Sequence, residues 1–174
     1  TVDCSHVILL QGDEPLLSPD HVASMVSAIR SGREADAWNV TGPIEDASEL
    51  DRHSFVKCVV GADDRIAFCF RRSPCFSPYD IQRGFTRKIL GIIAYRKDFL
   101  TRLVAMPAAN VEVAESIEQM RIVENGYLLR SVPVSESLPS VNEPHEVKIV
   151  LDHLELDRRQ KSLLEQILPA ATNA

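Results

Sequence analysis

The stretch HVILLQGDEP, residues 6–15, decides how this chain folds. Its first part, residues 6–11, is a short and almost continuous apolar run, which is typical of a strand buried on both faces of a sheet. Gly12 ends the run, and Asp13 follows at the place where open α/β sheets hold their ligands. The stretch therefore predicts a buried strand whose carboxyl end carries a candidate binding loop.

An amphipathic helix is predicted directly after this loop. Ser18 is a natural N-cap, Pro19 suits the first helical turn, and Gly32 ends the pattern. Between them the apolar residues recur at the spacing of one helical face, at Val22, Met25, Val26 and Ile29. A strand, a loop and a helix in this order are the beginning of an α/β fold.

The rest of the chain continues to alternate between strand and helix patterns. Further strands are predicted at 37–44, 55–60, 65–70, 88–95 and 127–134, with a hairpin turn at 61–64. Helices are predicted at 98–104, 111–124, 143–154 and 157–168, and a long irregular loop at 73–84. The expected buried faces are Val113, Ile117 and Met120 in the second of these helices, and Val147, Val150, Leu151 and Leu154 in the third. This order predicts an α/β fold with a mixed sheet.

Charge and cysteine content narrow the class of protein. The 174 residues include 19 Lys and Arg against 25 Asp and Glu, a net charge of -6, which disfavours nucleic acid and anionic membranes as partners. No stretch approaches the roughly 20 apolar residues that cross a bilayer, and no signal layout opens the sequence. We interpret the four cysteines as free buried thiols of a cytoplasmic protein, rather than as zinc or disulfide ligands: Cys4, Cys58, Cys69 and Cys75.

The loop after the first strand has the residue types of a cation and phosphate site. Gly12 lets the backbone approach a ligand closely, and Asp13 offers a carboxylate to a divalent cation such as Mg²⁺, which in turn holds phosphate oxygens. The alternative interpretation is a tight turn in which Asp13 and Glu14 only keep the loop solvated. The local sequence leaves both interpretations open. Trp38, on a predicted strand, is interpreted as a core residue.

Four segments, in the same order along the chain, carry a resemblance to a known family. They are QGDEP (11–15), FVKCVVGADDRIAFCFRRSP (55–74), LGIIAYRKDFL (90–100) and EVAESIEQMRIVENGY (112–127). Together they resemble the 3-deoxy-manno-octulosonate cytidylyltransferases, or CMP-Kdo synthetases, and the related acylneuraminate cytidylyltransferases. The likeness runs from about residue 6 to residue 154, nearly the whole chain.

The resemblance implies a fold and a reaction. The fold is the Rossmann-like nucleotide-diphospho-sugar transferase fold, here as a partial α/β domain at 1–156 followed by a C-terminal helix and tail at 157–174. The reaction is that of a nucleotidyltransferase, which uses CTP and Mg²⁺ to activate an acidic 3-deoxy sugar as its CMP derivative, with release of pyrophosphate, for lipopolysaccharide biosynthesis. Such a transfer requires positioning and charge neutralisation more than covalent help from the protein.

The resemblance also assigns residues to the site. Asp13 matches the metal aspartate, Arg72 matches a basic residue that faces the sugar carboxylate, and Glu118 with Gln119 match a pair that lines the sugar pocket. The expected catalytic residues are Asp13 and Arg72, and the expected substrate contacts are Gln11, Gly12, Arg72, Glu118 and Gln119. Without the resemblance, Arg72 is equally a surface cation, and Glu118 with Gln119 a solvated helix face.

Several positions depart from the family pattern. Asn142 stands where a second metal aspartate is expected, and an amide is a weaker ligand for a hard cation, although Asn142 also suits the N-cap of the next helix. Ile89 and Ile93 replace a histidine and a tyrosine, which would leave sugar hydroxyls unpaired and disfavours Kdo itself as substrate.

The opening strand and phosphate loop of the family are also missing, so we expect the sequence to be a fragment of a longer polypeptide. The alternative is a non-catalytic relative that serves as a binding or assembly module. Similar proteins are commonly homodimers, and the apolar residues in 163–168 offer a surface for a second copy.

Overall fold

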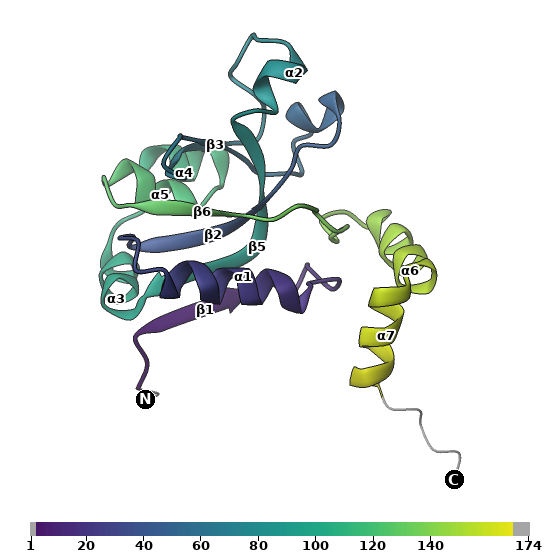
Figure 1. Cartoon of the computed structure of the whole chain (residues 1–174). Coiled ribbons are helices and arrows are strands. Elements are labelled where there is room, and N and C mark those ends of the chain that lie inside the picture. Colours follow the sequence, from purple (N-terminus) through teal and green to yellow (C-terminus); the bar gives the residue numbers. More distant parts are fainter. Residues whose placement is uncertain (1–2, 169–174) are drawn as a thin grey trace. The chain divides into compact units, whose positions relative to one another are not determined.

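The computed structural model describes residues 3–168 (Figure 1). They divide into two compact units. The first contains the residues up to 11 together with 19–137, and the second contains 12–18 together with the residues from 138 onward. The boundary that the sequence suggests between residues 156 and 157 remains a prediction.

The first unit is built on a mixed sheet. Its strands, among the described residues, are β1 (His6–Leu10), β2 (Ala37–Gly42), β3 (Lys57–Val60), β4 (Ile66–Phe70), β5 (Thr86–Arg96) and β6 (Leu129–Pro133). The long strand β5 pairs antiparallel with β1, β2 and β3, and β3 pairs antiparallel with β4, whereas β2 and β6 are parallel. The predicted α/β fold with a mixed sheet is confirmed.

Strand β1 is less buried than the sequence suggested. Its register places Leu10 opposite Ile92, and β5 is its only pairing partner among the described strands. Leu9 and Leu10 are 45% and 49% exposed. The prediction of a strand buried on both faces is therefore wrong, because an apolar run reports hydrophobicity and not the number of elements that cover it.

Helices cover both faces of the sheet. The helices of the first unit that pack beside the sheet are α1 (Pro19–Arg30), α3 (Lys97–Ala105), α4 (Asn110–Glu115) and α5 (Gln119–Glu124). The short helix α2 (Tyr79–Gln82) projects beyond the sheet and lies in the segment 73–84, where the sequence predicts an irregular loop (Figure 1). Trp38 of β2 lies beside Ser24 of α1, whereas the next residue, Asn39, bonds to Gln119 of α5. Because successive strand residues point to opposite faces, α1 and α5 lie on opposite sides of the sheet (Figure 1). None of the described helices is both long and apolar enough to span a bilayer.

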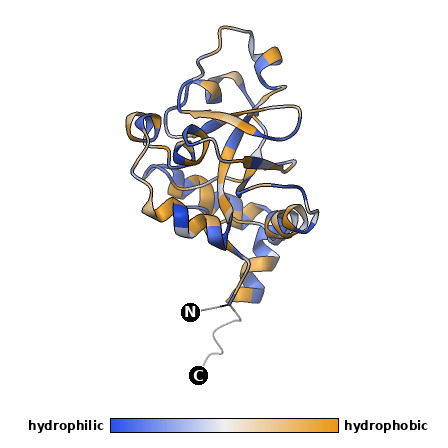
Figure 2. Cartoon of the chain, turned by 90° about the vertical axis from the view of Figure 1, so that its left-hand side faces the viewer, coloured by the Kyte–Doolittle hydropathy of each residue, from blue (hydrophilic) through white to orange (hydrophobic). Residues whose placement is uncertain are grey.

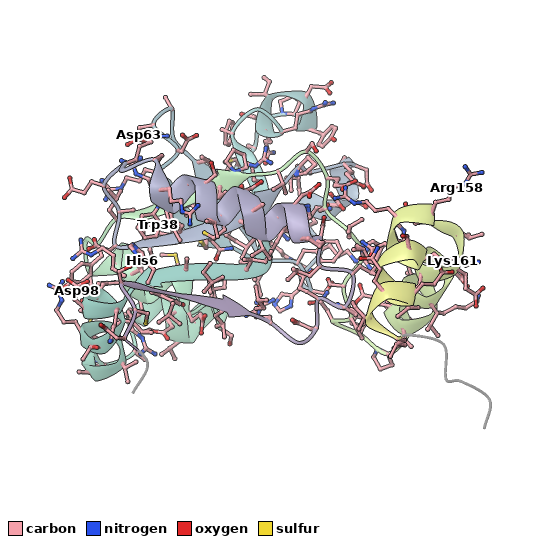
Figure 3. All side chains as sticks on the ribbon, turned by 60° about the horizontal axis from the view of Figure 1, so that its bottom comes forward. His6, Trp38, Asp63, Asp98, Arg158 and Lys161 are labelled. Atoms are coloured by element: carbon pink, nitrogen blue, oxygen red, sulfur yellow. The ribbon has the colours of Figure 1, made fainter. Side chains whose placement is uncertain are left out.

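The core of the first unit lies between the sheet and the helices α3 and α5. Phe99, Met120 and Leu129 are almost completely buried there, and the helices show alternating orange and blue faces in Figure 2. Trp38 is 4% exposed and its ring lies 5.5 Å from that of His6 (Figure 3). The interpretation of Trp38 as a core residue is confirmed.

The predicted helix at 111–124 is interrupted. It divides into α4 and α5 at Ser116, which has a left-handed backbone with φ of 54°. The guanidinium group of Arg71 donates to the carbonyl oxygens of Glu115 and Ser116, at 2.8 and 3.2 Å. Ile117 and Met120 are buried as predicted, but Val113 is 67% exposed. The prediction of one continuous helix is wrong, because a contact from a distant arginine holds the break.

Two of the four cysteines match the prediction. Cys58 and Cys69 face one another across β3 and β4 and are fully buried, and burial raises the pKa of Cys58 to about 12. Cys4 and Cys75 are only partly buried, so the prediction is wrong for them. All four are free thiols in the described structure.

The second unit contains two helices, α6 (Glu146–Leu156) and α7 (Arg158–Ile167), packed on each other. Asp157 caps α7 by accepting a hydrogen bond from the backbone of Gln160, and the Gln160 side chain donates to the carbonyl of Leu16. Helix α6 begins later than predicted. Of its expected buried face, Val150 is buried, whereas Val147 and Leu151 are 44% and 53% exposed, so that part of the prediction is wrong.

The buried Lys57 makes stability depend on pH. Its ammonium group donates to the carbonyl oxygens of Arg52 and Arg71, and burial lowers its pKa to about 8. Above pH 8 the folded state therefore releases a proton that the unfolded state keeps until about pH 10.5, so this group makes the folded state more stable as the pH rises. The buried cysteines oppose this trend from about pH 8, because thiols with the ordinary pKa of 9.0 in the unfolded chain begin to ionise there, and a change at Lys57 leaves this contribution in place.

We expect the free energy of unfolding, measured by urea denaturation between pH 8 and 9, to rise less steeply with pH in Lys57→Met than in the wild type. Lys161→Met, on the exposed side of α7 (Figure 3), is the control and is expected to keep the wild-type slope. Equal slopes for all three proteins would contradict the lowered pKa of Lys57.

Candidate active site

The carboxyl end of β1 leads into the predicted binding loop. The backbone N–H of Gln11 donates to the carbonyl of Gly91 at 2.8 Å, and the Gln11 side chain is exposed. A Cβ atom built on Gly12 meets no atom within 4 Å. Packing within the protein therefore does not require a glycine here, and the space beside this residue is open.

Asp13 offers a free carboxylate in the second unit. Its side chain is exposed and has no hydrogen-bonding or ionic partner among the described residues. Its backbone carbonyl accepts a hydrogen bond from the N–H of Val141 at 2.9 Å. This bond brings the loop of Asp13 beside the segment that contains Asn142.

Asn142 is not the N-cap of the helix that follows it. Helix α6 begins only at Glu146, and His145 occupies its N-cap position. The Asn142 amide donates to the hydroxyl of Ser140 at 2.8 Å, and the Glu146 carboxylate accepts from the backbone N–H of Asn142 at 2.7 Å. The N-cap interpretation is therefore wrong, and the amide oxygen of Asn142 remains available to a ligand.

Asp13 and Asn142 are the predicted metal ligands of this loop. The described residues contain no group of three or more His, Cys, Asp and Glu side chains suited to a metal. Asp13 and Asn142 supply one carboxylate and one amide oxygen, and Mg²⁺ commonly takes one or two carboxylates and completes its shell with water and substrate phosphates. The donor set fits Mg²⁺ when a phosphate ligand shares the ion.

In the first unit, two adjacent arginines have different environments. Arg71 is held by the carbonyl oxygens of His53, Glu115 and Ser116 and is part of the framework. Arg72 is exposed and has no partner in the described structure. The predicted Arg72 is thus the free cation of the pair, and its neighbour ties this segment to the break that precedes α5.

The predicted pair Glu118 and Gln119 also divides into two roles. Glu118 is exposed, and the hydroxyl of Tyr95 donates to its carboxylate at 3.5 Å. Burial, reinforced by Glu118, raises the pKa of Tyr95, so its hydroxyl remains protonated and can donate. Gln119 is 7% exposed and donates to the side-chain oxygen of Asn39 at 3.1 Å. The solvated-face interpretation therefore holds for Glu118 and is wrong for Gln119.

Ile89 and Ile93 both pack in the apolar core. Ile93 is 2% exposed, and Ile89 is partly buried against the same cluster. As the sequence predicts, neither of these apolar side chains can form a hydrogen bond with a ligand.

A cavity of about 380 Å³ opens elsewhere in the first unit, between α1 and β6. The guanidinium groups of Arg33 and Arg130 at its rim already bond to the carbonyl of Asp63, and Arg33 also pairs with Asp64. None of the predicted site residues lines this cavity, so the candidate site does not include it.

Sequence reasoning missed Arg71, Asn39 and Lys57 as residues that position the site. Two adjacent arginines give no signal for which one is engaged. For Asn39 a signal existed, because it is an amide within an otherwise apolar strand core, where all six residues of β2 are buried.

Comparisons with known proteins identify the family of this chain. A family model described as cytidylyltransferase matches residues 2–137. The chain belongs to the cytidylyltransferase family. The 3-deoxy-manno-octulosonate cytidylyltransferase of Synechococcus elongatus is 32% identical over 148 residues, which are 84% of this chain and 60% of that protein. The protein of that name from Escherichia coli is 33% identical over 143 residues, covering 82% and 57%. The chain thus spans about 60% of the length of these relatives.

Solved structures show the same fold. CMP:2-keto-3-deoxy-manno-octonic acid synthetase complexed with CTP superimposes with a TM-score of 0.77 and 31% identity, over 89% of this chain and 64% of that one. The inositol-1-phosphate CTP transferase of T. maritima shares the fold at a TM-score of 0.59, with 14% identity, over 99% of this chain and 60% of that one. This cytidylyltransferase therefore has the fold of the CMP-Kdo synthetases.

The two arginines give a matched test of the site's framework. We expect Arg71→Ala to lower the free energy of unfolding by about 2 kcal/mol, because it leaves several carbonyl groups without a charged donor. Arg72→Ala removes an exposed cation and is expected to change the free energy of unfolding by less than about 0.5 kcal/mol. Urea denaturation of both variants measures the difference, and equal losses would contradict the assignment.

Proposed function

We propose that this cytidylyltransferase contributes to the activation of an acidic 3-deoxy sugar of the Kdo class. In the reaction, the anomeric hydroxyl oxygen of the sugar bonds to the α-phosphorus of CTP. The bond from this phosphorus to the leaving pyrophosphate oxygen breaks, and CMP-sugar and pyrophosphate are formed. The agreement of sequence and fold with the CTP-bound CMP-Kdo synthetase structure, along 89% of the chain, carries the proposal.

The free carboxylate of Asp13 supports the phosphate part of this proposal. Asp13 and Asn142 are the residues that would hold Mg²⁺, which when bound supplies neutralisation of the charge on the phosphates. Gly12 leaves open space beside this carboxylate, so the backbone does not obstruct a ligand. The exposed Gln11 side chain precedes this loop and is assigned to substrate contact.

The sugar part of the proposal depends on Arg72. An unpaired guanidinium group is suited to a carboxylate because its planar fork can donate two parallel hydrogen bonds. Glu118 and Gln119 offer acceptors and a donor for sugar hydroxyls. The proposal also includes a cytoplasmic location and a homodimer, which the free cysteines and the exposed Ile167 and Leu168 support.

The neutral Asn142 favours a second candidate function. A site with one carboxylate binds a hard cation more weakly than one with two, which would suit a non-catalytic binding or assembly module. Incubation of the natural polypeptide that contains this chain with each of the four nucleoside triphosphates, Mg²⁺ and a panel of acidic sugars distinguishes the two. Release of pyrophosphate with CTP and one sugar supports the enzyme, and none with any combination supports the module.

Removal of the Asp13 side chain tests the metal assignment. We expect Asp13→Ala to lower Mg²⁺-dependent pyrophosphate release from CTP by about 100-fold or more, because it removes the sole carboxylate of the proposed site. Asp152→Ala, which removes a surface carboxylate of α6, is the control and keeps the wild-type rate. Unchanged turnover in Asp13→Ala would exclude the role assigned to Asp13.

Arg72→Ala tests the sugar assignment. We expect the KM for the acidic sugar to rise roughly 10-fold to 100-fold while the KM for CTP stays within about twofold, because only the sugar carboxylate loses its partner. Arg102→Ala, on the exposed face of α3, is the control. An equal rise in both KM values would place Arg72 elsewhere.

A further inference from the structure

We propose that Asn39 is a positioning residue, which fixes the side-chain amide of Gln119 so that its carbonyl oxygen accepts a hydrogen bond from a hydroxyl of the sugar substrate. The inference rests on the proposed function, because Gln119 is assigned to the sugar there. It extends that function in two ways. It assigns a role to Asn39, which lies on β2 and not on α5, and it states that Gln119 presents a hydrogen-bond acceptor to the sugar.

The register of the sheet explains why an amide stands at position 39. The pairing of β2 with β5 shifts between Asn39 and Thr41, so the ladder is interrupted there. The side-chain amide nitrogen of Asn39 donates to the carbonyl oxygens of Leu90, at 2.8 Å, and of Ile92, at 3.3 Å. Asn39 is completely buried, and an apolar residue in its place would remove the donor that these carbonyl oxygens share.

These contacts determine which way the Asn39 amide faces. Its nitrogen faces carbonyl oxygens, which only accept hydrogen bonds, and a third one, from Val40, lies at 2.9 Å. Its oxygen must therefore point the other way, toward α5. There it accepts the hydrogen bond from the amide nitrogen of Gln119 at 3.1 Å. The orientation of the first amide thus fixes that of the second.

Besides the second hydrogen of its amide nitrogen, Gln119 keeps its carbonyl oxygen for a ligand. No described residue donates a hydrogen bond to it, and it is not among the sealed polar atoms that lack a partner, which are in Ser54, Thr86 and His153. This oxygen therefore keeps contact with solvent, although Gln119 as a whole is only 7% exposed. A ligand that reaches it meets a fixed acceptor.

The backbone of Gln119 is fixed independently of its side chain. Gln119 is the first residue of α5, and Arg71 holds the break at Ser116, three residues earlier. Two contacts from different strands, Arg71 after β4 and Asn39 in β2, therefore define where this acceptor lies. Such preorganisation favours a substrate hydroxyl over an analogue that lacks it, because the analogue leaves the acceptor unpaired.

The test is a double-mutant cycle in the natural polypeptide, assayed by pyrophosphate release with CTP and 2-keto-3-deoxy-manno-octonic acid. We expect Asn39→Ala and Gln119→Ala each to raise the KM for the sugar about tenfold, with the KM for CTP unchanged. In the Gln119→Ala background, the added Asn39→Ala change is expected to have no further effect on the KM for the sugar. Thr41→Val, a buried change on the same strand that removes the hydrogen bonds of this hydroxyl with Ser131 and Arg87, is the control for instability alone and keeps the sugar KM.

Four outcomes overturn the inference. Independent effects of the two changes, or an unchanged sugar KM in Asn39→Ala, remove the positioning role while the proposed function stands. Absence of turnover with every sugar removes the proposed function and this inference with it. If Asn39→Ala does not fold, the wild type is titrated with the sugar and observed by NMR. We expect the resonance of the Gln119 side-chain amide to shift on binding. An unshifted resonance in an active protein contradicts the proposal.

Discussion

Three consecutive carbonyl groups of β5 connect the end of β1 with the side chain of Asn39 in β2. The oxygen of Gly91 accepts from the backbone of Gln11 on one side, and those of Leu90 and Ile92 accept from the amide of Asn39 on the other. The end of β1 and the bulge of β2 are therefore set by the same short segment. The side chain of Gln119 is tied to it through a single further bond.

Local chemistry predicts the bounds of the first helix correctly, although it fails for the N-cap assigned to Asn142. Ser18, Pro19 and Gly32 bounded the first helix because capping and left-handed backbone are local preferences, and Gly32 indeed has φ of 73°. The break at Ser116 was missed because its cause, Arg71, lies 45 residues away in the sequence. The exposure of Leu9 and Leu10 was missed because apolar runs do not report how many neighbours cover them.

The residues of the candidate site also divide into those that the local sequence predicts and those that depend on distant contacts. Asp13 and Arg72, which are free side chains, could be named from a motif alone. Arg71, Asn39 and Lys57, which hold other groups in place, could not, because their importance comes from the carbonyl oxygens they reach. Those oxygens belong to the backbone, and the sequence specifies their position only through the complete fold. Positioning residues are therefore harder to predict than residues that meet the ligand.

The position of Asn39 changes how the apolar substitutions in β5 should be understood. Ile93, where the resemblance leads one to expect a tyrosine, is the register partner of Asn39 on β2. Apolar side chains at 89 and 93 remove hydroxyl and imidazole groups from β5, yet the neighbouring strand places a neutral amide at the same level of the sheet. Two polar groups of α5 or its N-cap adjoin these strands: the carboxylate of Glu118, which accepts from Tyr95, and the oriented amide of Gln119. Under the proposed function, an amide oxygen can accept a hydrogen bond from a sugar hydroxyl as a phenol oxygen can. The loss of the two polar residues would then change which hydroxyls are recognised, without abolishing recognition.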